Sequence, residues 1–187
     1  GQHYAQQTFR VEQNKREQRR TARQVIVAGL KHFSDVAPVT VLPVGGNHGE
    51  ERIEGASYTD FSDNIDVAVV EDAADILSEN DRFAGVTFHI PAADLTQTID
   101  LHGTVVGLAH GHQAKRGGQT PAQKIAKWWE GQMTGRQPIG DADVLITGHY
   151  HHFLAQSVGP RTHFQAPALD GGSEWWVDMS GLDSPAG

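Results

Sequence analysis

The sequence predicts a mixed α/β fold, because apolar, β-branched runs alternate along the chain with segments of helical periodicity. Three of the apolar runs, at residues 39–44, 104–109 and 143–147, predict strands, and each is followed within a few residues by glycine and histidine. In α/β proteins the carboxyl ends of strands carry the reactive groups. We therefore expect the three strand ends to contribute to one site.

Composition narrows the class of protein. A chain of 187 residues is long enough for one domain with a substantial core, and its formal net charge of −8 argues against general nucleic-acid affinity. The charge is uneven, because residues 10–31 contain seven Lys or Arg and two Glu. A solvated helix face is the expected explanation, with contact to a polyanion as the alternative. The chain has no cysteine and no apolar run of membrane-spanning length, so a cytoplasmic location is expected.

Three helices are expected. Residues 5–33 form the first, with a buried stripe in its second half made of Ala22, Val25, Ile26, Gly29, Leu30 and Phe33. Residues 61–79 form the second, and its acidic residues are expected to be a solvated face rather than a metal site: Asp63, Asp66, Glu71, Asp72 and Asp75. The third begins at Thr120, which has the capping pattern of a helix start, and its tryptophans Trp128 and Trp129 are expected to pack.

Further strands are expected at residues 83–90 and 95–101, followed by a closing hairpin from 153–158 and 161–169. Short connections at residues 91–94 and 102–103 are typical of antiparallel hairpins. His89 and His102 lie in or beside these strands and are expected to be structural or surface residues.

Histidine is the most informative residue type in this chain. There are eleven, and five of them occupy positions 110, 112, 149, 151 and 152. On extended backbone His149 and His151 would face the same side, since side chains alternate along a strand. Neutral imidazoles and amide oxygens are ligands for borderline divalent cations such as zinc, manganese or iron. The pattern therefore predicts a metal site.

The ordered motifs resemble those of the calcineurin-like metallophosphoesterases. The resemblance rests on Gly46-Asn47-His48, on the strand-end His110 and on Gly148-His149-Tyr150-His151, and it covers about residues 20–170. It implies a four-layer α/β/β/α sandwich, here missing its N-terminal strands, with the site at the carboxyl ends of the strands.

Residue roles follow from the resemblance alone. Asn47, His110 and His149 would bind one divalent metal ion and His151 a second, the ions being Mn, Fe or Zn. His48 would be the acid that stabilises the transition state or protonates the leaving oxygen. Such a pair of ions would clamp a phosphate ester and activate hydroxide for in-line attack.

Two departures from the family pattern stand out. The two upstream motifs of the family, Asp-x-His and Gly-Asp-x-x-Asp, do not occur before Asn47. We expect residues 1–187 to be a single domain that lacks roughly 40–80 residues at its N-terminus, judged from the missing strands and usual loop lengths, with truncation at the C-terminus as a further option. Gly49 stands where the family has an acid beside the histidine, and Glu50 or Glu51 is a candidate replacement. His112 and His152 are expected beside the site, without a ligand role.

Several functions remain open at this point. The main interpretation is a metal-dependent phosphoric ester hydrolase, with phosphodiesters favoured over phosphomonoesters and DNA or RNA among the candidate substrates. The alternative is a non-catalytic binding or structural module with a degenerate, metal-poor site. A metallo-β-lactamase-like enzyme is disfavoured, because Tyr150-His151-His152 is followed by Phe153 and does not give that family's motif.

Overall fold

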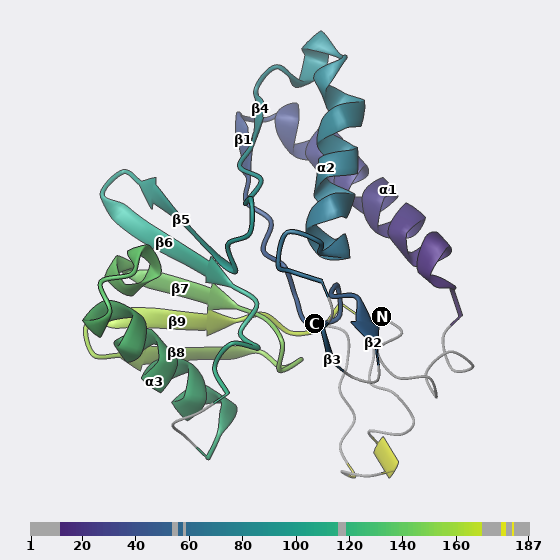
Figure 1. Ribbon diagram of the computed structural model, residues 1–187. Helices are drawn as coiled ribbons and strands as arrows, with labels where there is room; N and C mark the ends of the chain where they lie inside the picture. Colours follow the sequence, from purple (N-terminus) through teal and green to yellow (C-terminus); the bar gives the residue numbers. More distant parts are fainter. Residues whose placement is uncertain are drawn as a thin grey trace. The chain divides into compact units, whose positions relative to one another are not determined.

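Helices and strands alternate along the chain in the computed structural model, which describes residues 12–53, 56–57, 59–115, 119–169, 177–178 and 181. The chain divides into two units, residues 1–95 and 96–187, and each combines helices with paired strands (Figure 1). The expected mixed α/β class is confirmed. Stacking of the sheets into four layers stays a prediction of the resemblance. No helix in the described ranges is both long and apolar enough to cross a membrane.

The first helix of the first unit, α1 (Lys15–Ser34), begins at a capping box. The Asn14 side chain accepts from the Glu17 amide, and the Glu17 side chain accepts from the Asn14 amide. The buried stripe differs from the expected one: Val25 and Phe33 are 62% and 60% exposed, whereas Leu30 is buried. The packing face consists of Ile26, Val27 and Leu30, which lie against Leu77 and Phe83. The expected stripe is therefore partly confirmed: Ile26 and Leu30 pack as predicted, Val25 and Phe33 are exposed, and Val27 belongs to the packing face instead.

The paired strands of the first unit are short. β1 (Val39–Val41) pairs in parallel with β4 (Val86–Phe88), and the segment between them contains α2 (Ile65–Ser78) and a 3₁₀ turn (Asp81–Phe83). A helix in the connection is what a parallel pair needs. β1 ends at Val41, earlier than the predicted residue 44, in keeping with the inability of Pro43 to donate a ladder hydrogen bond. β2 (Arg52–Ile53) and β3 (Ala56–Ser57) form a separate antiparallel pair.

A five-stranded sheet of order β5-β6-β7-β9-β8 organises the second unit. β6, β7 and β9 are parallel, whereas β5 and β8 run antiparallel at the two edges. The strands are β5 (Thr96–Leu101), β6 (Thr104–Ala109), β7 (Val144–Thr147), β8 (Leu154–Val158) and β9 (Arg161–Gln165).

Of the two hairpin connections expected before residue 104, only the second is confirmed. His102 and Gly103 have φ of 56° and 91° and join β5 to β6 through a two-residue turn of the kind that suits a hairpin. The hairpin expected at residues 91–94 is wrong, because β4 pairs in parallel with β1. The closing hairpin from β8 and β9 is confirmed.

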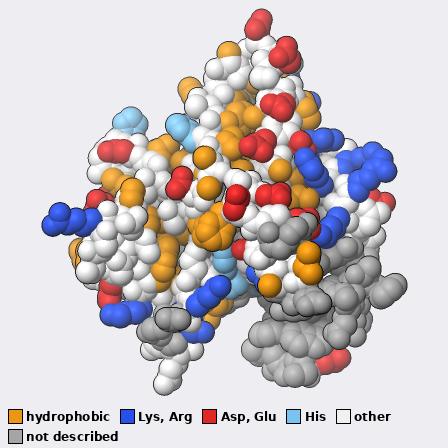
Figure 2. Space-filling view, viewed as in Figure 1, with side chains coloured by type: hydrophobic (Ala, Val, Ile, Leu, Met, Phe, Trp, Pro, Cys, Tyr) orange, Lys and Arg blue, Asp and Glu red, His pale blue; other side chains and the backbone are white. Residues whose placement is uncertain are grey.

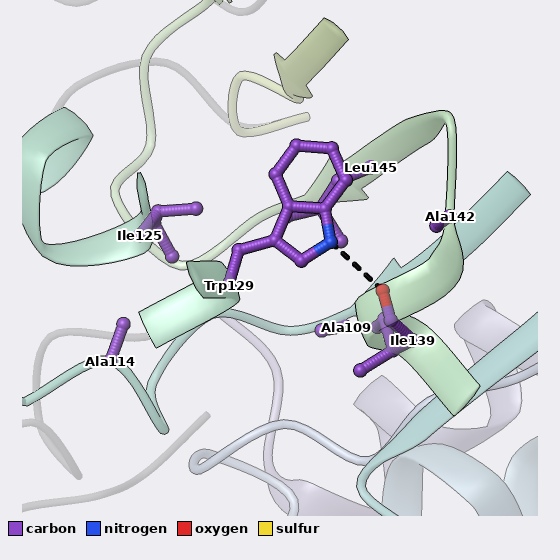
Figure 3. Packing of buried hydrophobic residues seen from close by; sticks show 7 residues of the cluster. All are labelled: Ala109, Ala114, Ile125, Trp129, Ile139, Ala142 and Leu145. Atoms are coloured by element: carbon purple, nitrogen blue, oxygen red, sulfur yellow. Dashed lines mark hydrogen bonds between the residues drawn. The ribbon is translucent and has the colours of Figure 1, made fainter. Parts of the chain in front are cut away.

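Trp129 on α3 (Pro121–Thr134) centres the core of the second unit. It is fully buried, and its indole Nε1 donates to the Ile139 carbonyl at 2.8 Å, in the 3₁₀ turn Pro138–Asp141 (Figure 3). The Arg161 guanidinium lies 4.0 Å from the centre of the indole ring. Ile139 also packs over Gly107 of β6, where a Cβ would come within 2.9 Å of its side chain. β6 and β7 pair in parallel beneath this packing, so their carboxyl ends meet at one edge.

Candidate functional site

Three imidazoles gather at the carboxyl ends of β6 and β7. The two strands are paired in parallel with Ala109 opposite Thr147, so His110 and the Gly148-His149 step follow at the same level. The Gly148 amide donates to the His110 carbonyl at 3.0 Å and continues the ladder by one bond. We call His110, His112 and His149 the histidine cluster.

The rings of the histidine cluster touch one another. The centroid of His110 lies 5.2 Å from that of His149 and 5.4 Å from that of His112, and the third separation is 6.2 Å. Two imidazoles on one tetrahedral zinc ion have centroids about 5 Å apart, given Zn–N bonds of about 2.0–2.1 Å. The donor type and the spacing thus suit a borderline divalent cation. As arranged, however, no group of three or more His, Cys, Asp or Glu within the described ranges forms a ready metal shell.

A glycine allows the close approach of His110 and His112. Gly111 has φ of 106°, a conformation that other residues rarely adopt. A Cβ at this position would make only ordinary contacts, 3.4 Å from the Ile125 side chain and 3.5 Å from the His149 side chain, so the φ angle is what requires glycine. The His110-Gly111-His112 turn therefore depends on glycine at its centre. His112, expected beside the site, lies within the cluster.

The backbone at His149 and His151 differs from the extended form predicted. Their φ angles are 72° and 56°, so both residues lie in the left-handed region. The argument that they face one side of a strand is therefore wrong. His149 is half-buried in the cluster, whereas His151 is exposed and lies outside the described ring contacts. Non-glycine residues in this region store strain and concentrate at functional sites.

Burial sets the protonation of His149. Its pKa is lowered first by burial and second by repulsion from the neighbouring His151. The Tyr150 ring packs edge-on at 4.7 Å between centroids, and burial raises the pKa of its hydroxyl. Because the pKa of His149 is lowered from 6.5, its imidazole is neutral near pH 7, which is the form that binds a metal ion.

A buried network behind the cluster was missed from the sequence. His163 on β9 is fully buried and lies 2.9 Å from Thr147 Oγ1 and 3.0 Å from Gln156 Nε2. Because the Gln156 amide nitrogen can only donate, His163 Nδ1 accepts and Nε2–H donates to Thr147. Gln165, also buried, donates from Nε2 to the His152 carbonyl at 2.8 Å. The network fixes both ends of the loop that carries His149 and His151. The sequence held one indication of this network: side chains alternate between the two faces of a strand, and His163 occupies an inward-facing position of β9.

The other predicted residues, Asn47 and His48, lie in a turn of the first unit. Asn47 is half-buried and His48 is exposed, and both are engaged in contacts of their own. The turn is held from the start of α2: Asn64 Nδ2 donates to the Gly46 carbonyl at 2.9 Å, and the Gly46 amide donates to Asp66 Oδ2 at 3.0 Å.

Asp66 is exposed, as expected for a solvated face, but its carboxylate also accepts a hydrogen bond from the Gly46 amide. Partial desolvation raises the pKa of this carboxyl, and the Gly46 hydrogen bond opposes that shift. Asp66 also explains Gly49: a Cβ there would meet Asp66 Oδ2 at 2.6 Å and would overlap Asn64 Oδ1. The two candidate replacements for the missing acid are paired with cations, Glu50 with Arg52 at 2.7 Å and Glu51 with Lys15 at 3.6 Å.

Comparisons with known proteins give no family assignment. No family model and no curated protein matches the chain. Among solved structures it is similar to Vps29 from Entamoeba histolytica, as a single mutant and as the wild type complexed with Zn²⁺, each with 20% identity and a TM-score of 0.44 over 84% of this chain and 70% of that chain. Vacuolar protein sorting 29 from Cryptosporidium parvum gives 13% identity and a TM-score of 0.38, over 72% of this chain and 77% of that one.

Proposed function

We propose that this chain is a metallophosphoesterase-like binding module whose histidine cluster takes one divalent metal ion, and that by itself it does not hydrolyse phosphate esters. The observation that carries the proposal is the make-up of the cluster: three half-buried imidazoles lie at the ends of β6 and β7 with ring centroids 5.2–6.2 Å apart, although as arranged no three His, Cys, Asp or Glu of the described ranges form a metal shell. Three imidazoles suit one borderline cation.

Hydrolysis by a dinuclear mechanism requires ligands for two metal ions, not one. Two ions about 3.5–4 Å apart are needed to clamp the attacking and leaving oxygens. In the ligand set implied by the resemblance, His151 alone would hold the second ion, and His151 is exposed. A single exposed imidazole is a weak ligand set, which favours one bound ion over two.

Calorimetric titration with ZnCl₂, followed by metal analysis after desalting, tests the stoichiometry. We expect one equivalent for the chain, lost in His110→Ala and in His149→Ala. His32→Ala is the matched control, because His32 is exposed on α1. Uptake of two equivalents, or uptake unchanged in the cluster variants, would contradict the proposal.

The second candidate function is a metal-dependent phosphoesterase, and the left-handed backbone at His149 and His151 favours it. In this proposal Asn47, His110 and His149 would hold one ion and His151 the other, and His48 would be the acid. Bound ions would supply charge stabilisation and an activated water. Turnover of bis-p-nitrophenyl phosphate with Mn²⁺, abolished in His149→Ala and retained in His32→Ala, would establish this function and overturn the first.

A further inference from the structure

Four arginines share one face of the first half of α1. Arg16, Arg19, Arg20 and Arg23 line a shallow, open hollow of about 210 Å³. Their spacing of three and four residues places them side by side along the helix. Figure 2 shows Lys and Arg side chains gathered over this part of the molecule, at the right of the view.

Two of these arginines pair with a carboxylate of the same unit, and the other two are exposed to solvent. Arg19 makes two hydrogen bonds of 3.0 Å to the Asp72 carboxylate on α2, and Arg23 lies 3.7 Å from the same carboxylate. Arg16 and Arg20 are exposed, and no described residue pairs with either. The Asp72 carboxylate thus pairs with two of the four guanidinium groups, and Glu17 lines the surface beside Arg16 and Arg20. Like charges at this spacing repel and destabilise a helix, and a bound anion would remove that cost.

The arginine face continues the buried face of the same helix. Ile26, Val27 and Leu30, which pack into the core, follow Arg16, Arg19, Arg20 and Arg23 on the same side of α1. Packing of the second half of α1 therefore anchors the helix backbone that carries the arginine row. From residue 16 to residue 23 the row is about 10 Å long, at 1.5 Å per residue.

We propose that this arginine face binds the phosphate backbone of single-stranded nucleic acid. Guanidinium groups form paired hydrogen bonds with phosphate oxygens, and a row about 10 Å long can engage successive phosphates of one strand. Acidic residues of α2, among them Glu71 and Asp75, are exposed on the neighbouring helix of the same unit. Their repulsion opposes a broad anionic surface such as a lipid bilayer and leaves a narrow strand as the better fit.

Fluorescence anisotropy with a labelled 20-nucleotide oligo(dT) tests the proposal directly, with no metal added. For the wild type we expect a dissociation constant between about 10⁻⁴ and 10⁻⁶ M, weakening with salt. The double variant Arg16→Gln/Arg20→Gln should bind at least about tenfold more weakly, and the slope of log K against log salt should fall in magnitude by about 1.4, because two phosphate contacts are lost. This variant leaves the Asp72 pairs intact.

The control variant removes two positive charges from a different helix, α3. Lys124→Gln/Lys127→Gln on α3 also deletes two positive charges, and it should leave the affinity within about twofold. Three results would overturn the proposal: no binding of oligo(dT) by the wild type, equal losses in both double variants, or binding only to vesicles of 80% phosphatidylcholine and 20% phosphatidylserine. Because no metal is added, none of these results bears on the metal-binding proposal.

Discussion

His163 Nε2 lies 2.9 Å from Thr147 Oγ1 on the neighbouring strand β7, and both residues are buried. Thr147 is the last residue of β7, and Gly148 and His149 follow it. The neutral tautomer of His163 is therefore part of what holds the His149 loop in place. Protonation would replace the acceptor at Nδ1 with a second donor facing the Gln156 amide.

Stability is expected to fall in mildly acidic solution because of His163. Burial lowers its pKa from 6.5 to about 4, so the unfolded chain takes up a proton between these values while the folded chain does not. The contribution is fully present above pH 6.5 and is lost as the pH falls toward 4. Urea unfolding should give a free energy about 2 kcal/mol lower at pH 5 than at pH 7.5 from this group.

The same measurement on His163→Gln isolates the effect, since glutamine does not titrate. The difference in pH dependence between the two proteins should equal the contribution of His163. An NMR titration gives an independent reading, in which the His163 ring protons should not shift between pH 7.5 and pH 5.5. A midpoint near 6.5 in the folded protein would show that the ring is not buried as described.

Gly49→Ala is expected to destabilise the first unit by about 1–3 kcal/mol. The added Cβ would lie 2.6 Å from the Asp66 carboxylate and would overlap Asn64 Oδ1, which caps α2. Gly29→Ala is the matched control: no atom lies within 4 Å of its Cβ position, and it lies within α1. That change should stabilise the protein by about 0.5–1 kcal/mol through helix propensity. Thermal unfolding of both variants checks the opposite signs.

In the second unit, the sequence predicted the positions of the strands better than the backbone conformation of the loop that carries His149 and His151. Periodicity and turn residues located the strands around His110 and His149, because apolar runs bounded by glycine carry a strong local signal. The left-handed backbone of His149 and His151 could not be read in this way, because it depends on tertiary contacts such as those of Gln165 and His152.

In the first unit, the sequence located the second helix but did not reveal the contacts that its residues make with the Gly46 turn. Asp66 looks like one of several acidic residues on an amphipathic helix, and that pattern does not reveal its hydrogen bond from the Gly46 amide, twenty positions away in the chain. Gly49 was noticed as a missing acid. Its structural reason, the space taken by Asn64 and Asp66, needs coordinates. Long-range contacts of this kind leave no periodic trace in a single sequence.

Trp129→Phe is expected to destabilise the second unit by about 2–4 kcal/mol. The change leaves the buried Ile139 carbonyl without its donor and opens a cavity where the larger ring was, beneath Arg161. Trp128→Phe should cost less than about 1 kcal/mol, because Trp128 is only partly buried against the same core. Urea unfolding followed by circular dichroism compares the two. Equal losses would show that Trp129 is not the centre of this core.

Asp66→Asn is expected to raise stability at pH 7 only slightly, because Asp66 is exposed and solvent screens its charge. Partial desolvation raises the pKa of this carboxyl, so the folded state resists ionisation, and stability declines as the pH rises from 3.8 through the folded-state pKa. An asparagine oxygen can still accept from the Gly46 amide, without the negative charge. Asp66→Ala removes the acceptor as well and should destabilise by about 1–2 kcal/mol. If Asn and Ala lowered the stability equally, the charge itself would be what holds the Gly46 turn.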